Sequence, residues 1–183
     1  MSRLGKRPIK TDDNITISVE NNKFIAKSTK GERILDLPDE IKVKIENGII
    51  TTSRNGNSKF EKSQHGLITR LISGIIADLS KGAKKTLEFK GTGYRVRVEG
   101  TELILNMGYS HEIKLDIPEE IAVNVVKNSI VIEGIDRQKV GEFAAKVRKV
   151  RPPEVYKGKG IKYSEEVIRR KAGKTAQSAG KAA

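Results

Sequence analysis

Residues 35–45 read LDLPDEIKVKI, and residues 115–125, which lie 80 positions later, read LDIPEEIAVNV. Six of these eleven positions are identical, and the apolar positions all match in kind. One inserted residue later, Gly48-Ile49-Ile50 corresponds to Ser129-Ile130-Val131. A repeat of this length in only two copies is not a solenoid, which stacks three or more short units. The pattern therefore predicts a duplicated domain.

The first copy alternates apolar and polar residues and then shows a helical stripe. Alternation predicts strands around 15–19, 24–27 and 41–45, with Asn47-Gly48 as a tight hairpin turn into 49–51. Apolar residues spaced by three and four from Ile68 to Leu79 predict a helix that ends at Gly82.

The second copy repeats this order of elements. Strands are expected at 87–89, 94–98, 103–107, 113–117, 121–125 and 130–132, and then a helix carries Val140, Phe143, Ala144 and Val147. The expected fold class is α+β, with two duplicated domains, each a small, mostly antiparallel sheet packed with one helix, plus a basic C-terminal extension. The expected domains are 1–82, 83–150 and 151–183, with the junction between the repeats at 80–85.

The positive charge is concentrated near the C-terminus. The chain has a formal net charge of +13, and residues 137–183 hold 14 Lys and Arg against four Glu, a net charge of +10. The first 136 residues hold 22 basic and 19 acidic residues and are nearly balanced. A localised basic segment indicates a polyanionic partner, with nucleic acid as the first expectation and an anionic membrane as the second.

Several other classes of protein are disfavoured by the composition. There is no Cys, which excludes disulfides, thiolate metal sites and a Cys nucleophile, and fits a reducing compartment. No apolar run is long enough to span a membrane, and the first residues do not look like a signal peptide. His65 and His111 are both expected in loops, with contact to RNA left open, and neither has the neighbours that a metal site requires.

The C-terminal segment carries the strongest functional pattern. Residues 151–153 read RPP and are expected to end the second helix, and residues 154–163 read EVYKGKGIKY. Glycines let a backbone approach a surface closely, lysines bind phosphates, and tyrosines can stack on bases. This combination predicts a loop that packs against folded RNA. The alternative is a basic loop that is exposed to solvent and contacts no partner. Tyr156 is expected either to stack on a base or to pack beneath the loop.

Beyond this loop, Ser164 is expected to cap a short helix whose last turn is basic. The RNA footprint is expected after Val147, with contacts mainly to phosphates, because Gln177 is the only Asn or Gln from residue 146 onward. The candidate RNA-binding residues are Arg151, Tyr156, Lys157, Gly158, Lys159, Gly160, Lys162, Tyr163, Arg169, Arg170, Lys171 and Lys174.

The segment RPPEVYKGKGI at 151–161 resembles the signature of the bacterial-type large-subunit ribosomal protein six family. Similar family segments correspond to residues 2–9, 65–67, 91–96 and 105–111, so the resemblance covers essentially the whole chain. Val155 departs from the pattern, since the family commonly has a further proline there, but the Tyr-Lys-Gly-Lys-Gly core at 156–160 is intact.

The resemblance implies a non-enzymatic structural constituent of the large ribosomal subunit that binds large-subunit ribosomal RNA near the factor-binding region at the stalk base. It implies neighbouring ribosomal proteins as partners, transient proximity to translation factors, and a place in cytoplasmic or organellar ribosomes. No cofactor, metal, membrane or small-molecule substrate is expected.

Alternatives from other classes are a free-standing RNA-binding factor, a hydrolase or transferase acting on RNA, and a peripheral membrane protein. Gly173-Lys174-Thr175 is not a phosphate-binding loop, because Ile168 stands where the motif needs its first glycine. Gly91-Thr92-Gly93 lacks the third glycine of a dinucleotide fingerprint, since Val96 stands there. No group of candidate residues suggests catalysis.

Overall fold

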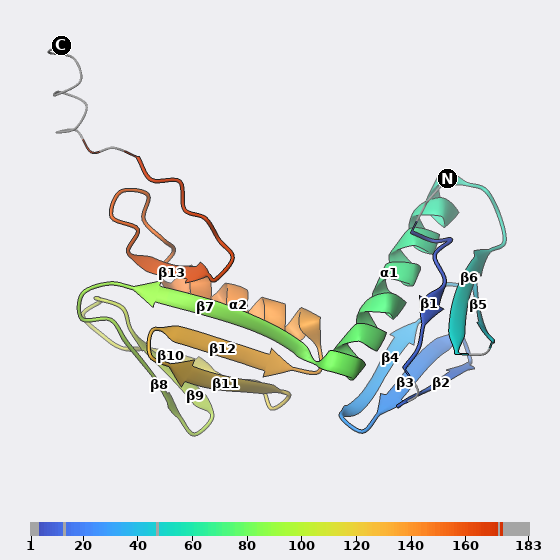
Figure 1. Cartoon of the computed structure of the whole chain (residues 1–183), viewed down its shortest axis with the longest axis horizontal. Coiled ribbons are helices and arrows are strands. Elements are labelled where there is room, and N and C mark those ends of the chain that lie inside the picture. The colour runs from blue at the N-terminus through green and yellow to red at the C-terminus, as the bar shows by residue number, and fades with distance from the viewer. Residues whose placement is uncertain (1–3, 13, 47, 172, 174–183) are drawn as a thin grey trace, which may run out of the picture. The chain divides into compact units, whose positions relative to one another are not determined.

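The computed structural model describes residues 4–12, 14–46, 48–171 and 173, and the chain forms two compact units. Unit 1 contains the residues up to Gly82 together with Ile135–Arg137, and unit 2 contains Ala83–Gly134 and the residues from Gln138 onward. Each unit combines small antiparallel sheets with one helix (Figure 1), which confirms the predicted α+β class.

Unit 1 has two three-stranded sheets, in the orders β1-β6-β5 and β2-β3-β4, and a long helix. Isoleucines on one face of the helix pack with Phe24, Ile41 and Ile50 to form the core of this unit. The elements are β1 (Ile9–Lys10), β2 (Ile15–Glu20), β3 (Lys23–Ser28), β4 (Gly31–Asp36), β5 (Ile41–Glu46), β6 (Ile49–Arg54) and α1 (Lys59–Lys81).

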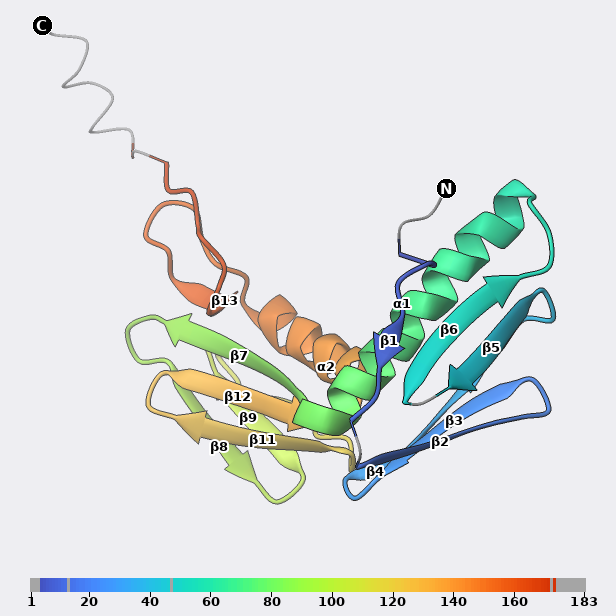
Figure 2. The same cartoon turned by 45° about the vertical axis from the view of Figure 1, so that its right-hand side comes forward.

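Unit 2 has a three-stranded sheet in the order β10-β9-β8 and a four-stranded sheet in the order β11-β12-β7-β13. Figure 2 shows β11, β12 and β7 side by side in the larger sheet. Its core joins the sheets to the buried face of its helix through Leu87, Leu103, Ile130 and Phe143. The elements are β7 (Ala83–Lys90), β8 (Arg95–Glu99), β9 (Glu102–Asn106), β10 (Ile113–Asp116), β11 (Ile121–Val126), β12 (Ser129–Gly134), α2 (Arg137–Val150) and β13 (Gly160–Tyr163).

The sequence repeat occupies equivalent places in the two units. Ile41 opens β5 and donates its backbone N–H to Pro38 at 3.0 Å, and Ile121 opens β11 and donates to Pro118 at 2.9 Å. Both strands then form a hairpin with the next strand. The duplication inferred from residues 35–45 and 115–125 is therefore a duplication of structure.

The prediction that one residue is inserted after this repeat in the second copy is wrong. Ile45 pairs with Ile50 in the first hairpin, and Val125 pairs with Ile130 in the second, so the offset stays at 80. Ile50 and Ile130 are both fully buried. Matching Ile49 to Ile130 by residue type shifts the strand by one position, which would turn every side chain to the opposite face.

Helix α1 begins earlier than the apolar stripe suggested, at a capping box. The Ser58 hydroxyl accepts from the backbone N–H of Glu61 at 3.1 Å, and the Glu61 carboxylate accepts from the backbone N–H of Ser58 at 2.8 Å. These hydrogen bonds with Ser58 lower the pKa of Glu61. The expectation that His65 lies in a loop is wrong, because it lies in α1, buried, with Nε2 at 3.0 Å from the Thr52 hydroxyl.

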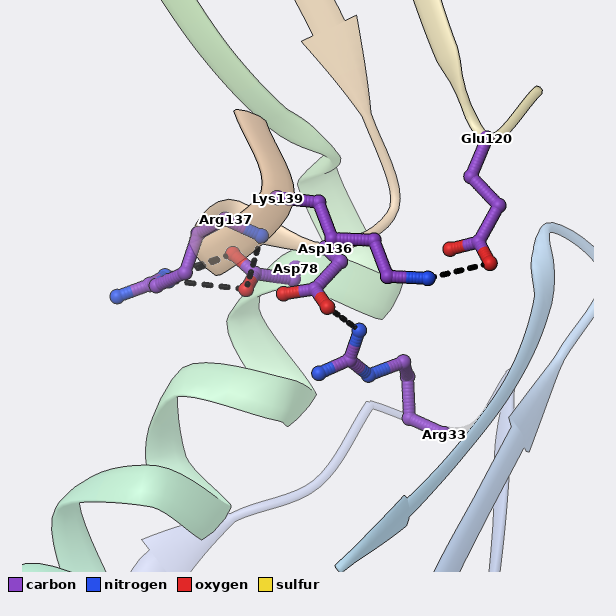
Figure 3. A network of polar contacts seen from close by, with 6 residues as sticks. All are labelled: Arg33, Asp78, Glu120, Asp136, Arg137 and Lys139. Carbon is purple, nitrogen blue, oxygen red and sulfur yellow. Dashed lines mark hydrogen bonds and ion pairs between the residues drawn. The ribbon is translucent and has the colours of Figure 1, made fainter. Parts of the chain in front are cut away.

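Ile135 and Asp136, which link β12 to α2, and Arg137, the first residue of α2, belong to unit 1. Figure 3 shows the polar contacts of Asp136 and Arg137. Asp136 forms an ion pair with Arg33 of β4, and its side chain is only 8% exposed. Arg137 donates from Nε at 2.9 Å and from Nη2 at 2.7 Å to the Asp78 carboxylate near the end of α1, and this carboxylate is also 8% exposed. The next pair shown, Lys139 with Glu120 at 2.5 Å, lies within unit 2 and is about half exposed.

The buried carboxylates predict a large stability difference between two matched substitutions. Arg33→Met keeps the aliphatic stem but removes a charged partner of Asp136, and it should destabilise unit 1 by about 3 kcal/mol. Lys139→Met breaks an exposed pair and should cost less than about 1 kcal/mol. Native-state hydrogen exchange of the α1 and α2 amides measures both effects. Similar small losses from both substitutions would contradict the importance of the buried pair.

Candidate nucleic-acid interface

The basic residues after α2 are arranged around a strand that the sequence did not reveal. β13 pairs antiparallel with β7, with Ile161 opposite Phe89 and Tyr163 opposite Leu87, and it lies at the edge of the four-stranded sheet (Figure 1). Ile161 is fully buried in the core of unit 2. The segment is therefore anchored by a sheet and a core residue, and we call residues 151–163 the basic hairpin.

Backbone hydrogen bonds close the basic hairpin on itself. Ile161 donates its N–H to Arg151 at 2.8 Å, and Glu154 donates to Lys159 at 2.8 Å. Within the loop, Gly158 donates to Glu154 at 3.1 Å. These bonds fix the tip at 155–158 as a tight turn above β13.

The glycines of the hairpin serve the fold directly. Gly160 has φ +133°, and a Cβ there would lie 2.5 Å from the carbonyl oxygen of Pro152. Gly158 has φ +69°, which also favours glycine. The close approach of Gly160 is thus made to the chain itself, at Pro152 and Pro153, whereas a Cβ at Gly158 would lie 3.0 Å from the Arg170 guanidinium. Any contact with RNA remains a prediction for both residues.

Most of the basic residues that are predicted to bind RNA are exposed on the surface of this segment. Lys157, Arg169, Arg170 and Lys171 are exposed, and Lys159 is half-buried. Within the part of the chain that the structure describes, none of these five forms an ion pair with a carboxylate. Lys162 differs from them, because its ammonium group lies 3.0 Å from the Glu88 carboxylate across the β13–β7 pair. Lys174 lies outside the described residues.

The two tyrosines of the hairpin have different environments. Tyr156 lies at the tip with 55% of its surface exposed, so it does not pack beneath the loop. Tyr163 is half-buried against the core of unit 2, with the charged groups of Lys85 and Arg148 each 5.9 Å from its ring centroid. Of these two tyrosines, Tyr156 is therefore the one available for stacking.

The short helix predicted to start at Ser164 is wrong, because residues 164–171 form a turn followed by irregular structure. The Glu166 carboxylate accepts from Arg148 Nη2 at 2.5 Å and from the backbone N–H of Tyr163 at 3.1 Å. Lys171 donates its N–H to Val155 at 3.0 Å, which returns the chain to the hairpin tip. Isolated helices this short are marginal, and these contacts favour the turn.

The pair of Arg148 and Glu166 shifts the titration of both groups. The hydrogen bond from Arg148 lowers the pKa of Glu166, and the same bond raises the pKa of Arg148. The pair joins the last turn of α2 to the segment that follows β13, so it holds the exposed basic residues in place.

No group of three or more His, Asp or Glu residues that could hold a metal ion occurs among the described residues. No helix in the same ranges is long and apolar enough to cross a membrane. His111 lies exposed in the loop between β9 and β10, as the sequence predicted.

Comparison with known proteins adds independent findings. Residues 90–164, which include β13 and the basic hairpin, match the family model described as Ribosomal protein L6. The chain is 46% identical over 176 residues to "Large ribosomal subunit protein uL6" of Gloeothece citriformis, covering 96% of this chain and 98% of that one. It is also 46% identical over 177 residues to the uL6 protein of Finegoldia magna, covering 96% and 99% of the two chains. The uL6 protein of Borrelia garinii is 44% identical over 176 residues.

Gly160 provides a test of the hairpin geometry. Gly160→Ala should destabilise the hairpin by about 1–3 kcal/mol, because the Cβ overlaps a backbone carbonyl at a strained φ. Gly141→Ala, in α2 with open space around its Cβ, should instead stabilise unit 2 by about 0.5–1 kcal/mol. Urea denaturation of both variants checks the opposite signs. A neutral or stabilising Gly160→Ala would show that the approach to Pro152 is not required.

Glu166 predicts a specific dependence of stability on pH. Its folded-state pKa is lowered, so its contribution is present above the unfolded value of about 4.3 and is lost as pH falls through the folded value. Glu166→Gln should therefore cost about 1–3 kcal/mol at pH 7, and this difference from wild type should shrink in acid. Exposed Glu165 supplies the control as Glu165→Gln. A wild-type advantage over Glu166→Gln that stays constant down to about pH 2 would contradict the assignment.

Proposed function

Because the chain belongs to the family of large ribosomal subunit protein uL6, we propose that it binds large-subunit ribosomal RNA through the basic hairpin and residues 169–171. Membership makes the protein a structural constituent of the large ribosomal subunit and not an enzyme. Its place is in the ribosome in the cytoplasm, and its partners are ribosomal RNA and other ribosomal proteins.

The observation that carries the RNA-binding proposal is a set of exposed cations on an anchored backbone. Lys157, Arg169, Arg170 and Lys171 project from a segment fixed by β13, by the Arg148–Glu166 pair and by the bond from Lys171 to Val155. A preorganised group of cations loses less conformational entropy on binding than a mobile tail does. This arrangement supports binding to a phosphate backbone of fixed shape.

The mode of recognition follows from the side chains available. Lysine is a point charge on a flexible stem, which suits phosphates better than bidentate recognition of bases. Duplex RNA hides its base edges in a deep and narrow major groove, so a cationic hairpin senses mainly its shape. The proposed contacts are made by Arg151, Tyr156, Lys157, Gly158, Lys159, Gly160, Lys162, Tyr163, Arg169, Arg170, Lys171 and Lys174.

Two of these residues have specific local roles within the proposal. Lys162 forms an ion pair with Glu88, so its positive charge attracts RNA phosphates less than that of Lys157 does. Tyr163 supports the site from within unit 2 while Tyr156 faces outward.

The proposed division of the chain into 1–82, 83–150 and 151–183 assigns RNA binding mainly to the last segment. A position near the factor-binding region at the stalk base, with transient proximity to translation factors, belongs to the proposal as well.

Charge reversal tests the proposal against a matched pair in unit 1. Lys157→Glu with Lys159→Glu should reduce incorporation into large subunits far more than Lys42→Glu with Lys44→Glu, because the latter pair lies on the exposed side of β5 in the nearly balanced half of the chain. Incorporation is measured by sedimentation after a high-salt wash. Equal losses from the two double variants would show that the charge distribution does not locate the interface.

The salt dependence of binding tests the role of phosphates. If about six to ten phosphates are neutralised, affinity for a ribosomal RNA fragment should fall by about 10³ to 10⁵ between ~50 and ~200 mM salt, using the DNA slope as an upper guide. Swapping paired bases while preserving the RNA shape should leave affinity nearly unchanged. A flat salt response, or strong loss on swapping paired bases, would contradict recognition by phosphates and shape.

A further inference from the structure

A second feature of unit 2 gathers aromatic rings and an arginine at one end of its smaller sheet. The loops 91–94 and 107–112 meet there, because Arg95 pairs with Asn106 and Ile113 pairs with Leu105. Two of the four tyrosines of the chain, Tyr94 and Tyr109, lie in these loops. The end of α2 reaches the same place, since the Tyr109 hydroxyl donates to the carbonyl oxygen of Val150 at 2.9 Å.

The Tyr109 ring is the centre of this cluster. The guanidinium carbon of Arg151 lies 5.1 Å from its centroid, within the range of a cation–π interaction. The His111 ring stacks with it at 6.3 Å between centroids and 29° between planes. Tyr109 is 39% exposed, and His111 and Arg151 are also exposed. Planar groups of three kinds are thus held together at the surface.

A purely structural role explains only part of this arrangement. Capping the last carbonyl of α2 requires the Tyr109 hydroxyl but neither the exposed His111 ring nor the Arg151 guanidinium. The only carboxylate in the loop 107–112 is that of Glu112, and it is bound by Arg97 at 2.9 Å through both oxygens. The cluster therefore presents aromatic faces and positive charge, with its nearest loop carboxylate already paired.

Glycines keep the surrounding loops small. Gly93 has φ +77° and open space where a Cβ would stand. Gly108 has φ +78°, and a Cβ there would lie 3.4 Å from the Tyr94 ring. A Cβ at Gly91 would lie 2.4 Å from the same ring, so this glycine is required by the place of Tyr94. The loops bring little bulk near the rings.

We propose that Tyr109, His111 and Arg151 form a stacking subsite for one unpaired nucleobase of the large-subunit RNA. Unstacked bases bind on aromatic side chains and on arginine guanidinium planes, whereas the faces of bases inside a duplex are already covered. The Arg151 guanidinium also forms an ion pair with the phosphate next to that base. The subsite rests on the proposed function and adds to it a contact with a single-stranded nucleotide, beside the phosphate contacts of the basic hairpin.

Affinity for the RNA tests the subsite in the full-length chain, with full-length large-subunit ribosomal RNA as the probe. His111→Ala and Tyr109→Leu should each weaken binding by about 5- to 150-fold, the range that corresponds to stacking on one base. Tyr109→Phe keeps the ring and should bind like wild type, although loss of the bond to Val150 lowers its melting temperature. The salt slope should not change in any of these variants, because no phosphate contact is removed.

Chemical probing identifies the base directly. Treatment of the complexes with dimethyl sulfate should show an unpaired base that wild type and Tyr109→Phe protect and that His111→Ala leaves reactive. Because His111 is exposed, His111→Ala should retain the wild-type melting temperature. Unchanged affinity and protection in both His111→Ala and Tyr109→Leu would overturn the subsite and leave the cluster as a cap for α2.

The same assay separates failure of the subsite from failure of the proposed function. Loss of binding by the Lys157→Glu and Lys159→Glu double variant, with none by His111→Ala, would overturn the stacking subsite alone. Wild-type binding by that double variant would overturn the proposed role of the basic hairpin, whatever the result for His111→Ala.

Discussion

The pairing of β13 with β7 is the constraint on which the candidate interface depends. β13 covers the outer edge of the four-stranded sheet and inserts Ile161 into the core of unit 2. The loop before it and the segment after it are then held at both ends, by the bond from Ile161 to Arg151 and by the Arg148–Glu166 pair. A strongly basic sequence, which alone would favour an extended and mobile chain, acquires a defined conformation because four of its residues complete a sheet.

The duplicated fold supplies the platform for this strand. β1 in unit 1 and β7 in unit 2 have equivalent positions, since each pairs with the last strand of a hairpin that follows a proline turn. Of these two strands, only β7 pairs with a further strand on its other side among the described residues, namely β13. The charge difference between the halves of the chain thus coincides with a structural addition to the second copy. Gly160 fits this addition closely, because the chain passes against the carbonyl of Pro152 at that point.

The sequence predicted the features that arise from periodicity. Alternation and the 80-residue repeat predicted most strands of the four sheets but not β1 or β4, and the spacing of apolar residues predicted the buried faces of α1 and α2. The sequence also failed to predict β13, because Gly160–Tyr163 is too short to show the alternation of a strand. Ile161 was the one available sign, as an isolated apolar residue in a basic run. The sequence also predicted a helix after Ser164 from capping preferences, where tertiary contacts of Glu166 decide the conformation. The Ser58 and Glu61 capping box was readable, and it would have placed His65 inside α1.

We infer that docking of β13, and not charge alone, makes the hairpin competent to bind RNA. The most direct measurement follows RNA affinity and amide protection of β13 through the series Ile161→Val and Ile161→Ala, which leaves the net charge at +13. Truncation to Ala in a fully buried site costs about 2–5 kcal/mol, enough to populate the undocked strand. We expect affinity for large-subunit RNA to fall in step with the loss of protection, since binding requires the docked strand. Unchanged affinity with an unprotected β13 would contradict it.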